Sequence, residues 1–203
     1  MLQAGRQATV NPVDNSSGFA LFPTAIGPCG MAWAGATILA THLPDTSDEA
    51  TREQLKRRSG VTQERHPSVE ARSAIAAITA LLEGARVDLG FIACDFSRLD
   101  PFSANVYRIA RAIPPGETLT YGAIAAELGD KRLAQAVGHA LGRNPWPIIV
   151  PCHRVLGANN RLTGFSASGG TRTKLRMLAI EGARLGEAPT LFGDLPLALR
   201  PGP

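Results

Sequence analysis

The chemistry that this 203-residue chain could perform is concentrated in one adjacent pair, Cys152 and His153. A free thiol is mostly protonated at neutral pH, and a neighbouring imidazole, acting directly or through a water, raises the fraction of nucleophilic thiolate. A carboxylate that fixes the imidazole tautomer completes such a triad, and spacing alone leaves both Glu181 and Glu187 as candidates. The alternative is an inert buried thiol beside an ordinary histidine. The longer string Pro-Cys-His-Arg at 151–154 favours the reactive pair, because chance rarely produces it.

The segment 144–155 must hold this pair in place. Its prolines at 145, 147 and 151 exclude a helix and predict a stiff, extended stretch. Adjacent residues on an extended strand point to opposite faces, so a direct contact between Cys152 and His153 needs a turn or a bridging water.

Helical patterns surround this segment from a boundary near residues 99–101 onward. They predict helices at 102–110, at 121–128 with Thr120 as cap and Gly129 as stop, at about 133–142, and at 171–181, with a loop at 164–170. Two short helices joined at 129–131 have the size of a helix-turn-helix, although such pairs are also common in proteins that never contact DNA.

The first half predicts a small α/β unit without a catalytic motif. Residues 19–43 indicate two or three short antiparallel strands, 45–58 and 67–83 indicate helices, and 91–96 indicates a further strand. We therefore predict an α+β fold, with a small N-terminal α/β domain containing an antiparallel sheet and a mostly helical C-terminal domain. The expected divisions are a frayed N-terminus (1–17), a scaffold domain (18–100), a C-terminal domain (101–188) and a tail (189–203).

Charge is distributed unevenly along the chain. Residues 1–100 hold 9 basic and 11 acidic side chains, whereas residues 101–203 hold 12 and 6, within a total net charge of +4. A basic second half suggests a polyanion such as nucleic acid, although a solvated surface would give the same balance. Three widely spaced cysteines and no long apolar run predict a cytoplasmic protein without a disulfide framework, membrane span or metal site.

The order and spacing of several motifs resemble the O6-alkylguanine-DNA alkyltransferases, also called methylated-DNA–protein-cysteine methyltransferases. The resemblance is strong from about 102 to 182 and loose in the first half, at residues 24–28. Its motifs are Ile-Pro-Pro-Gly-Glu-Thr at 113–118, Thr-Tyr-Gly at 120–122, Ala-Val-Gly at 136–138, Asn-Pro at 144–145, Pro-Cys-His-Arg-Val at 151–155 and Glu-Gly at 181–182.

This resemblance implies a direct-reversal DNA repair protein that moves an alkyl group from O6-alkylguanine, or from O4-alkylthymine, irreversibly onto Cys152. It makes His153 the base acting through a water, and Glu181 the group that orients it. Asn144 would hold the turn that presents the cysteine, and Tyr121 would donate a proton to the leaving base. Tyr121 also fits a half-buried packing residue, and Asn144 a simple turn former.

The resemblance also implies a winged-helix-like helix-turn-helix whose third helix enters the minor groove of double-stranded DNA containing alkylated bases. The mechanism needs only a monomer, without a cofactor or an obligate protein partner, although the sequence does not give the oligomeric state. Small residues at 136–138 would allow the helix backbone to approach the DNA closely, or would simply allow tight packing between helices. The implied DNA contacts are Ser103, Tyr121, Gly122, Gln135, Ala136, Gly138 and Arg143, with Lys131 and Arg132 facing phosphates, and the implied pocket residues are Val155, Phe165 and Ser166.

Two departures from the family pattern affect substrate choice. Gln135 stands where the family usually has an arginine that fills the gap left by a flipped base. The loop that usually reads Gly-Tyr-x-Gly-Gly is here Gly-Phe-Ser-Ala-Ser-Gly-Gly at 164–170, longer and without the phenol. The alternative function is an alkyltransferase-like protein that recognises damage with weak or altered repair. A cysteine hydrolase or thiol transferase with no DNA role would leave the helix pair unexplained.

Overall fold

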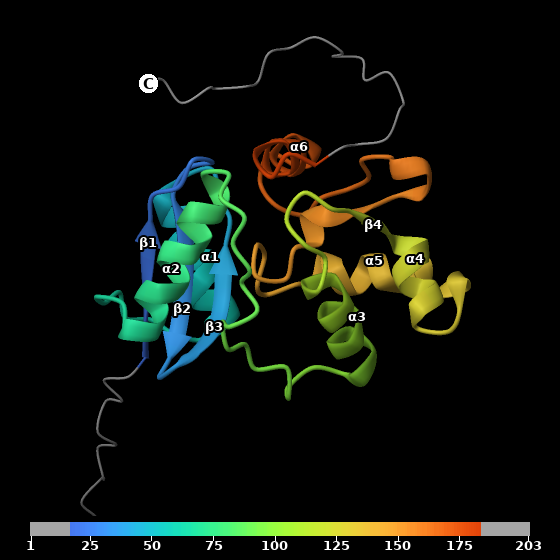
Figure 1. The fold of residues 1–203 in the computed structure, drawn as a ribbon. Coiled ribbons are helices and arrows are strands. Elements are labelled where there is room, and N and C mark those ends of the chain that lie inside the picture. The colour runs from blue at the N-terminus through green and yellow to red at the C-terminus, as the bar shows by residue number, and fades with distance from the viewer. Residues whose placement is uncertain (1–16, 184–203) are drawn as a thin grey trace, which may run out of the picture.

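The computed structural model describes residues 17–183, and its first half is built on a three-stranded antiparallel sheet (Figure 1). The expected short strands are present in the order β1-β2-β3. They are β1 (Ser17–Phe22), β2 (Cys29–Ala34) and β3 (Thr37–His42). The expected frayed segment lies outside the described residues except for Ser17, which begins β1.

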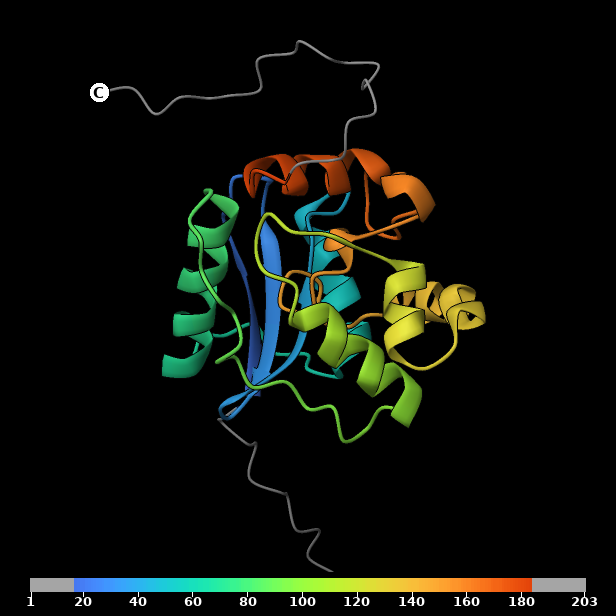
Figure 2. The ribbon, with the colours of Figure 1, turned by 45° about the vertical axis from the view of Figure 1, so that its right-hand side comes forward.

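Two helices, α1 (Asp48–Ser59) and α2 (Val69–Leu82), cover opposite faces of this sheet (Figures 1 and 2). Successive side chains of a strand point to opposite faces, and β2 follows this rule. Ala32 packs in a small cluster with Leu55 of α1, whereas Trp33 belongs to the large core that contains Ile78 of α2. Both predicted helices are therefore confirmed.

The strand predicted at 91–96 is absent, and that prediction is wrong. Ile38 of β3 makes only an isolated bridge to Cys94, with its amide donating to the Ala93 carbonyl at 2.8 Å. The Asp88 and Asp95 carboxylates on either side accept hydrogen bonds from backbone amides two residues further on. These local turns compete with a regular ladder and limit the pairing to one residue.

The second half is mostly helical, as expected for the α+β class. Asp100 accepts a hydrogen bond from the Ser103 amide and caps the first helix, with a proline at its first position. Figure 2 shows α4 and α5 side by side, which confirms the expected helix pair. The elements are α3 (Pro101–Arg111), β4 (Leu119–Thr120), α4 (Tyr121–Glu127), α5 (Ala134–Gly142), β5 (Val155–Leu156), α6 (Thr171–Ile180) and 3-10 turns at Lys131–Leu133, Cys152–Arg154 and Ala158–Asn160.

One large hydrophobic core runs through both halves. Trp33 and Ile38 of the sheet belong to the same buried cluster as Tyr107 of α3 and Trp146 of the loop after α5. The chain changes from sheet to helices at Asp100, but packing is continuous across that point. Within residues 17–183, no helix combines the length and the apolar character needed to cross a lipid bilayer. The predicted tail at 189–203 lies outside the described residues.

Candidate active site

Asn144 closes the loop that leads to Cys152. Its side-chain oxygen accepts a hydrogen bond from the Trp146 amide at 2.9 Å, and its side-chain nitrogen donates to the Val150 carbonyl at 2.8 Å. One buried side chain therefore bonds to both Trp146 and Val150 and closes the turn that runs between them. Ile148 within it has a positive φ of 79°, a conformation that a β-branched residue adopts only where its surroundings enforce it.

Strand β3 anchors the same loop from the N-terminal half. The Thr41 amide donates to the Pro145 carbonyl at 2.9 Å, and its hydroxyl donates to the Pro147 carbonyl at 2.6 Å. The indole of Trp146 donates to the Ile38 carbonyl at 2.8 Å. The sheet edge thus fixes the position of the cysteine-bearing loop, which gives the N-terminal half a direct part in the site.

The chain turns at Cys152 instead of staying extended. The prolines exclude an α-helix as predicted, but Cys152–Arg154 forms a 3-10 turn in which the Arg154 amide donates to the Pro151 carbonyl at 2.8 Å. The predicted extended conformation is therefore wrong at the cysteine. The sequence did not reveal this local hydrogen bond. It is compatible with a proline at position 151, because the proline supplies only its carbonyl oxygen and no amide donor.

His153 is completely buried and bonded to Glu181. Its Nε2 lies 2.9 Å from Oε1 of Glu181, the C-cap residue that directly follows α6, whereas Nδ1 makes no hydrogen bond to any described residue. A carboxylate acceptor holds the proton on Nε2, so Nδ1 is left as the basic nitrogen. Burial lowers the pKa of His153 despite the charge of Glu181, so the ring is neutral at pH 7. The other candidate carboxylate, Glu187, lies outside the described residues.

Arg154 shares the carboxylate of Glu181. Its Nε donates to Oε2 and its Nη2 to Oε1, both at 2.8 Å, while Nη1 donates to the Ile113 carbonyl at 2.6 Å. Burial alone would raise the pKa of Glu181, but the hydrogen bonds and charges of His153 and Arg154 lower it to about 2. Glu181 is therefore ionised under all ordinary conditions.

The pKa of Cys152 is raised by burial, so the resting sulfur carries its proton. A hydrogen bond from Asn144 and the positive charge of Lys174 act in the opposite direction. Lys174, on α6, is fully buried, donates to the Val155 carbonyl at 2.5 Å, and has its pKa lowered to about 8 by burial. At neutral pH the chain therefore carries a neutral thiol at Cys152 and a neutral imidazole at His153.

Tyr121 begins α4 beside these groups. The Lys174 ammonium lies 5.8 Å from the centre of its ring, and the ring packs against α5 so closely that a Cβ at Gly138 would lie 3.8 Å from it. Burial raises the pKa of Tyr121, so its hydroxyl remains a proton donor at neutral pH. The ring of Tyr121 thus lies near both α5 and the buried lysine.

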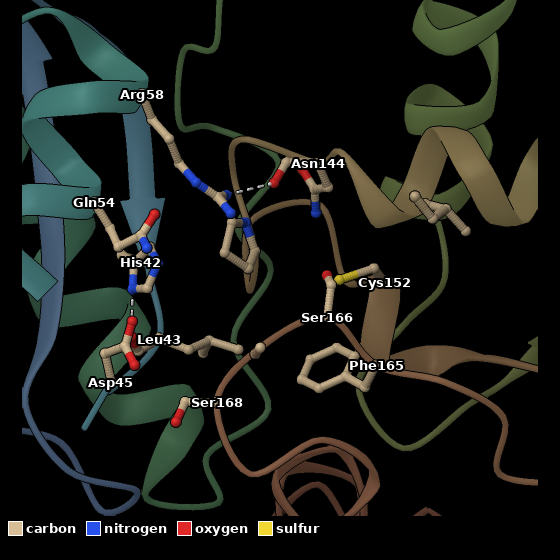
Figure 3. Close-up of a pocket in the computed structure, with 13 residues that line it drawn as sticks. His42, Leu43, Asp45, Gln54, Arg58, Asn144, Cys152, Phe165, Ser166 and Ser168 are labelled. Carbon is tan, nitrogen blue, oxygen red and sulfur yellow. Dashed lines mark hydrogen bonds between the residues drawn. The ribbon is translucent and has the colours of Figure 1, made fainter. Parts of the chain in front are cut away.

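A cavity of about 100 Å³ opens beside Cys152, which is itself partly exposed (Figure 3). Of the three residues that the family resemblance implies for a substrate pocket, Phe165 and Ser166 line this cavity, whereas Val155 is fully buried and does not. The far wall comes from the N-terminal half. The lining residues are His42, Leu43, Asp45, Gln54, Arg58, Leu141, Asn144, Pro147, Cys152, Phe165, Ser166, Ala167 and Ser168.

The residues expected to contact DNA differ in accessibility. Gln135 and Arg143, near the two ends of α5, are exposed, and Gly122, Ala136 and Gly138 are partly exposed. Val137 is fully buried in the core, so it supports α5 from beneath. Lys131 is exposed, and Arg132 is exposed but already paired with Asp130 at 2.9 Å. Ser103 is only 7% exposed, which leaves little of its side chain for a phosphate.

Three features of the site were not predicted from the sequence. These are the ion pair between Arg154 and Glu181, the buried Lys174, and the part of the cavity wall that comes from the N-terminal half. The spacing of Lys174 and Glu181 offered a signal, because seven residues make two helical turns and place both on one face. The cavity wall offered none, since it depends on the docking of β3 against the loop.

This geometry defines a class of protein in which a cysteine that lines a cavity is followed by a buried histidine bonded to a glutamate, in a domain that contains a helix-turn-helix. Residues 101–183 match the model of the family described as "6-O-methylguanine DNA methyltransferase, DNA binding domain". A methylated-DNA–protein-cysteine methyltransferase of Mycolicibacterium paratuberculosis is 46% identical over 91 residues, which are 45% of this chain and 54% of that protein. The chain thus spans about half the length of the curated relatives it matches.

Solved structures extend the similarity to both halves. The Mycobacterium tuberculosis O6-methylguanine methyltransferase is 31% identical, with a TM-score of 0.65 over 87% of this chain and 99% of that one. The M. tuberculosis OGT solved in complex with DNA is 32% identical, with a TM-score of 0.65 over 81% of this chain and 92% of that one. The chain therefore belongs to the O6-alkylguanine-DNA alkyltransferase family.

Proposed function

We propose that this chain repairs alkylated double-stranded DNA by transferring the alkyl group of O6-alkylguanine irreversibly to Cys152. The observation that carries the proposal is that His153, which directly follows the cavity-lining Cys152, is buried and bonded to Glu181. A neutral imidazole whose Nε2 proton is held by a carboxylate presents a basic Nδ1, which suits it to deprotonate a thiol directly or through a water.

The proposed transfer is a displacement at the alkyl carbon. The Cys152 proton passes to His153, the sulfur forms a bond to the carbon, and the bond between that carbon and O6 of guanine breaks. The electron pair of that bond moves into the base, which takes up a proton and leaves as guanine. Tyr121, whose hydroxyl stays protonated, is the proposed donor, and Lys174 stabilises the thiolate by its charge.

The alkylated base must reach the sulfur from within a duplex, so the proposal includes flipping the nucleotide at a cost of about a few kcal/mol. The exposed face of α5 is the proposed minor-groove element, because Ala136 and Gly138 offer little side chain to keep the backbone from the DNA. Arg143 and Lys131 would bind phosphates and make affinity depend on salt. Gln135 would hydrogen-bond the orphaned base without adding charge.

Stoichiometry tests this proposal. The chain is incubated with excess duplex containing O6-methylguanine, and restored guanine is counted after digestion of the DNA to nucleosides. Stoichiometric transfer predicts one restored guanine per protein molecule, and none with Cys152→Ser. Tight binding of the damaged duplex without restored guanine would instead establish the damage-recognition alternative.

A further inference from the structure

The cavity beside Cys152 is larger than a methyl group needs. Its volume of about 100 Å³ is enough for several water molecules, so a methyl group on the sulfur would leave most of it unfilled. In a displacement, sulfur, carbon and leaving oxygen lie in one line, so the remainder of a longer alkyl group projects sideways from the reacting carbon. This cavity is where such a remainder would lie.

The wall of the cavity comes from both halves of the chain (Figure 3). Leu141, Pro147 and Phe165 come from the C-terminal half and are apolar. Across the cavity, the N-terminal half contributes Leu43 and four polar side chains, which come from the end of β3, from the connection between β3 and α1, and from α1. These are His42, Asp45, Gln54 and Arg58.

Arg58 supplies the positive charge of this wall. It lies in the last turn of α1, and its Nη1 donates to the Asn144 carbonyl at 3.1 Å. This bond holds the guanidinium at the cavity, yet its partner is a neutral oxygen, and Arg58 forms no ion pair within residues 17–183. A guanidinium that is not held in a direct ion pair is a binding group for carboxylates.

Among the other titratable groups that line the wall, only Asp45 opposes this charge. Burial lowers the pKa of His42, and its Nδ1 lies 2.6 Å from the Leu43 carbonyl, so the ring is neutral at pH 7. Asp45 carries the opposing negative charge, and its Oδ1 accepts the Thr46 amide at 2.8 Å. Arg57 donates to Gln54 and does not line the cavity.

We propose that Arg58 makes the cavity selective for O6-alkyl groups that end in a carboxylate, of which carboxymethyl is the smallest. This inference rests on the proposed alkyl transfer. The same displacement gives an S-carboxymethyl cysteine at position 152 and restored guanine, with the carboxylate unchanged and paired with Arg58.

The test compares single-turnover rates of transfer from duplexes that carry O6-carboxymethylguanine or O6-methylguanine, and its readout is the ratio of the two rates. Arg58→Gln is expected to lower this ratio about tenfold, the effect of one lost hydrogen bond between charged groups. Arg58→Lys keeps the charge and retains most of the ratio, whereas Asp45→Asn raises it. Lys56→Gln is the matched control, because Lys56 lies on the same helix, pairs with Glu53 and does not line the cavity.

A structural role of Arg58 in holding the Asn144 turn would slow both transfers equally, and an unchanged ratio in Arg58→Gln therefore overturns the inference. Methyl transfer without any carboxymethyl transfer by the unaltered chain overturns it as well, while leaving the proposed function intact. Transfer of neither group overturns both.

Discussion

Replacing Glu181 with glutamine tests the buried charge network most severely. The carboxylate accepts two hydrogen bonds from Arg154 at 2.8 Å and one from His153 at 2.9 Å, and its side chain has no exposed surface. Glutamine has nearly the same shape, but only one of its two terminal atoms can accept hydrogen bonds. The substitution therefore removes the charge and leaves the packing in place.

The structure gives the magnitude by two routes. A pKa of about 2, compared with the ordinary 4.5, corresponds to about 3 kcal/mol in favour of the charged carboxylate, at about 1.4 kcal/mol for each pKa unit. Leaving a buried cation such as Arg154 without its partner costs about 3–5 kcal/mol. We expect Glu181→Gln to lower the free energy of unfolding by about 3 kcal/mol, measured by urea titration of the unreacted protein.

The same variant should also react more slowly. The amide cannot balance the charge that His153 acquires when it takes the thiol proton, so single-turnover methyl transfer is expected to fall by about tenfold or more. The double variant Arg154→Met with Glu181→Gln should recover part of the lost stability, because the unpaired cation is then gone. A Glu181→Gln protein that unfolds at the same urea concentration as the unaltered chain would refute this reasoning.

Three further predictions concern pH, the thiolate and the DNA surface. The pKa of Glu181 is lower in the folded chain than in the unfolded one, so its contribution to the free energy of unfolding is present above about pH 4.5. This contribution, up to about 3 kcal/mol, is lost as pH falls towards 2. Urea titrations across this pH range that show no decline in stability would contradict the prediction. Lys174→Met removes a positive charge that favours the Cys152 thiolate, and should slow iodoacetamide labelling of Cys152 at pH 7, where Lys174 is protonated; an unchanged labelling rate would exclude the electrostatic role. Gln135→Arg should change the rate of methyl transfer or the range of lesions accepted in duplex DNA, and identical rates on every lesion would show that position 135 plays no part in flipping.

Much of the fold could be predicted from local signals. The Asp100–Pro101 start of α3 and the Thr120 cap of α4 are contained within a few residues, so capping chemistry places both helices. The segment at 91–96 shows the opposite case. Its β-type composition predicts a strand, but the turns at Asp88 and Asp95 leave it one bridge to Ile38.

The features of the site also divide into those that the local sequence predicts and those that depend on contacts formed only in the folded chain. The adjacent Cys152 and His153 are visible in the sequence, whereas the 3-10 turn that orients them depends on a backbone bond that residue types do not specify. The positions of Arg58 and His42 depend on hydrogen bonds between β3 and residues 145–147, across more than a hundred residues of chain. No local pattern encodes such a contact, which is why the N-terminal wall of the cavity emerges only from the folded chain.

The most direct measurement of the central claim is the mass of the peptide that contains Cys152. After incubation with duplex DNA carrying O6-methylguanine, peptide mass spectrometry should find one added methyl group, with fragmentation placing it on the Cys152 sulfur. Undamaged DNA should add nothing, and neither Cys29 nor Cys94 should be modified. A Cys152 peptide of unchanged mass while the lesion disappears, or repair by Cys152→Ser, would contradict the account.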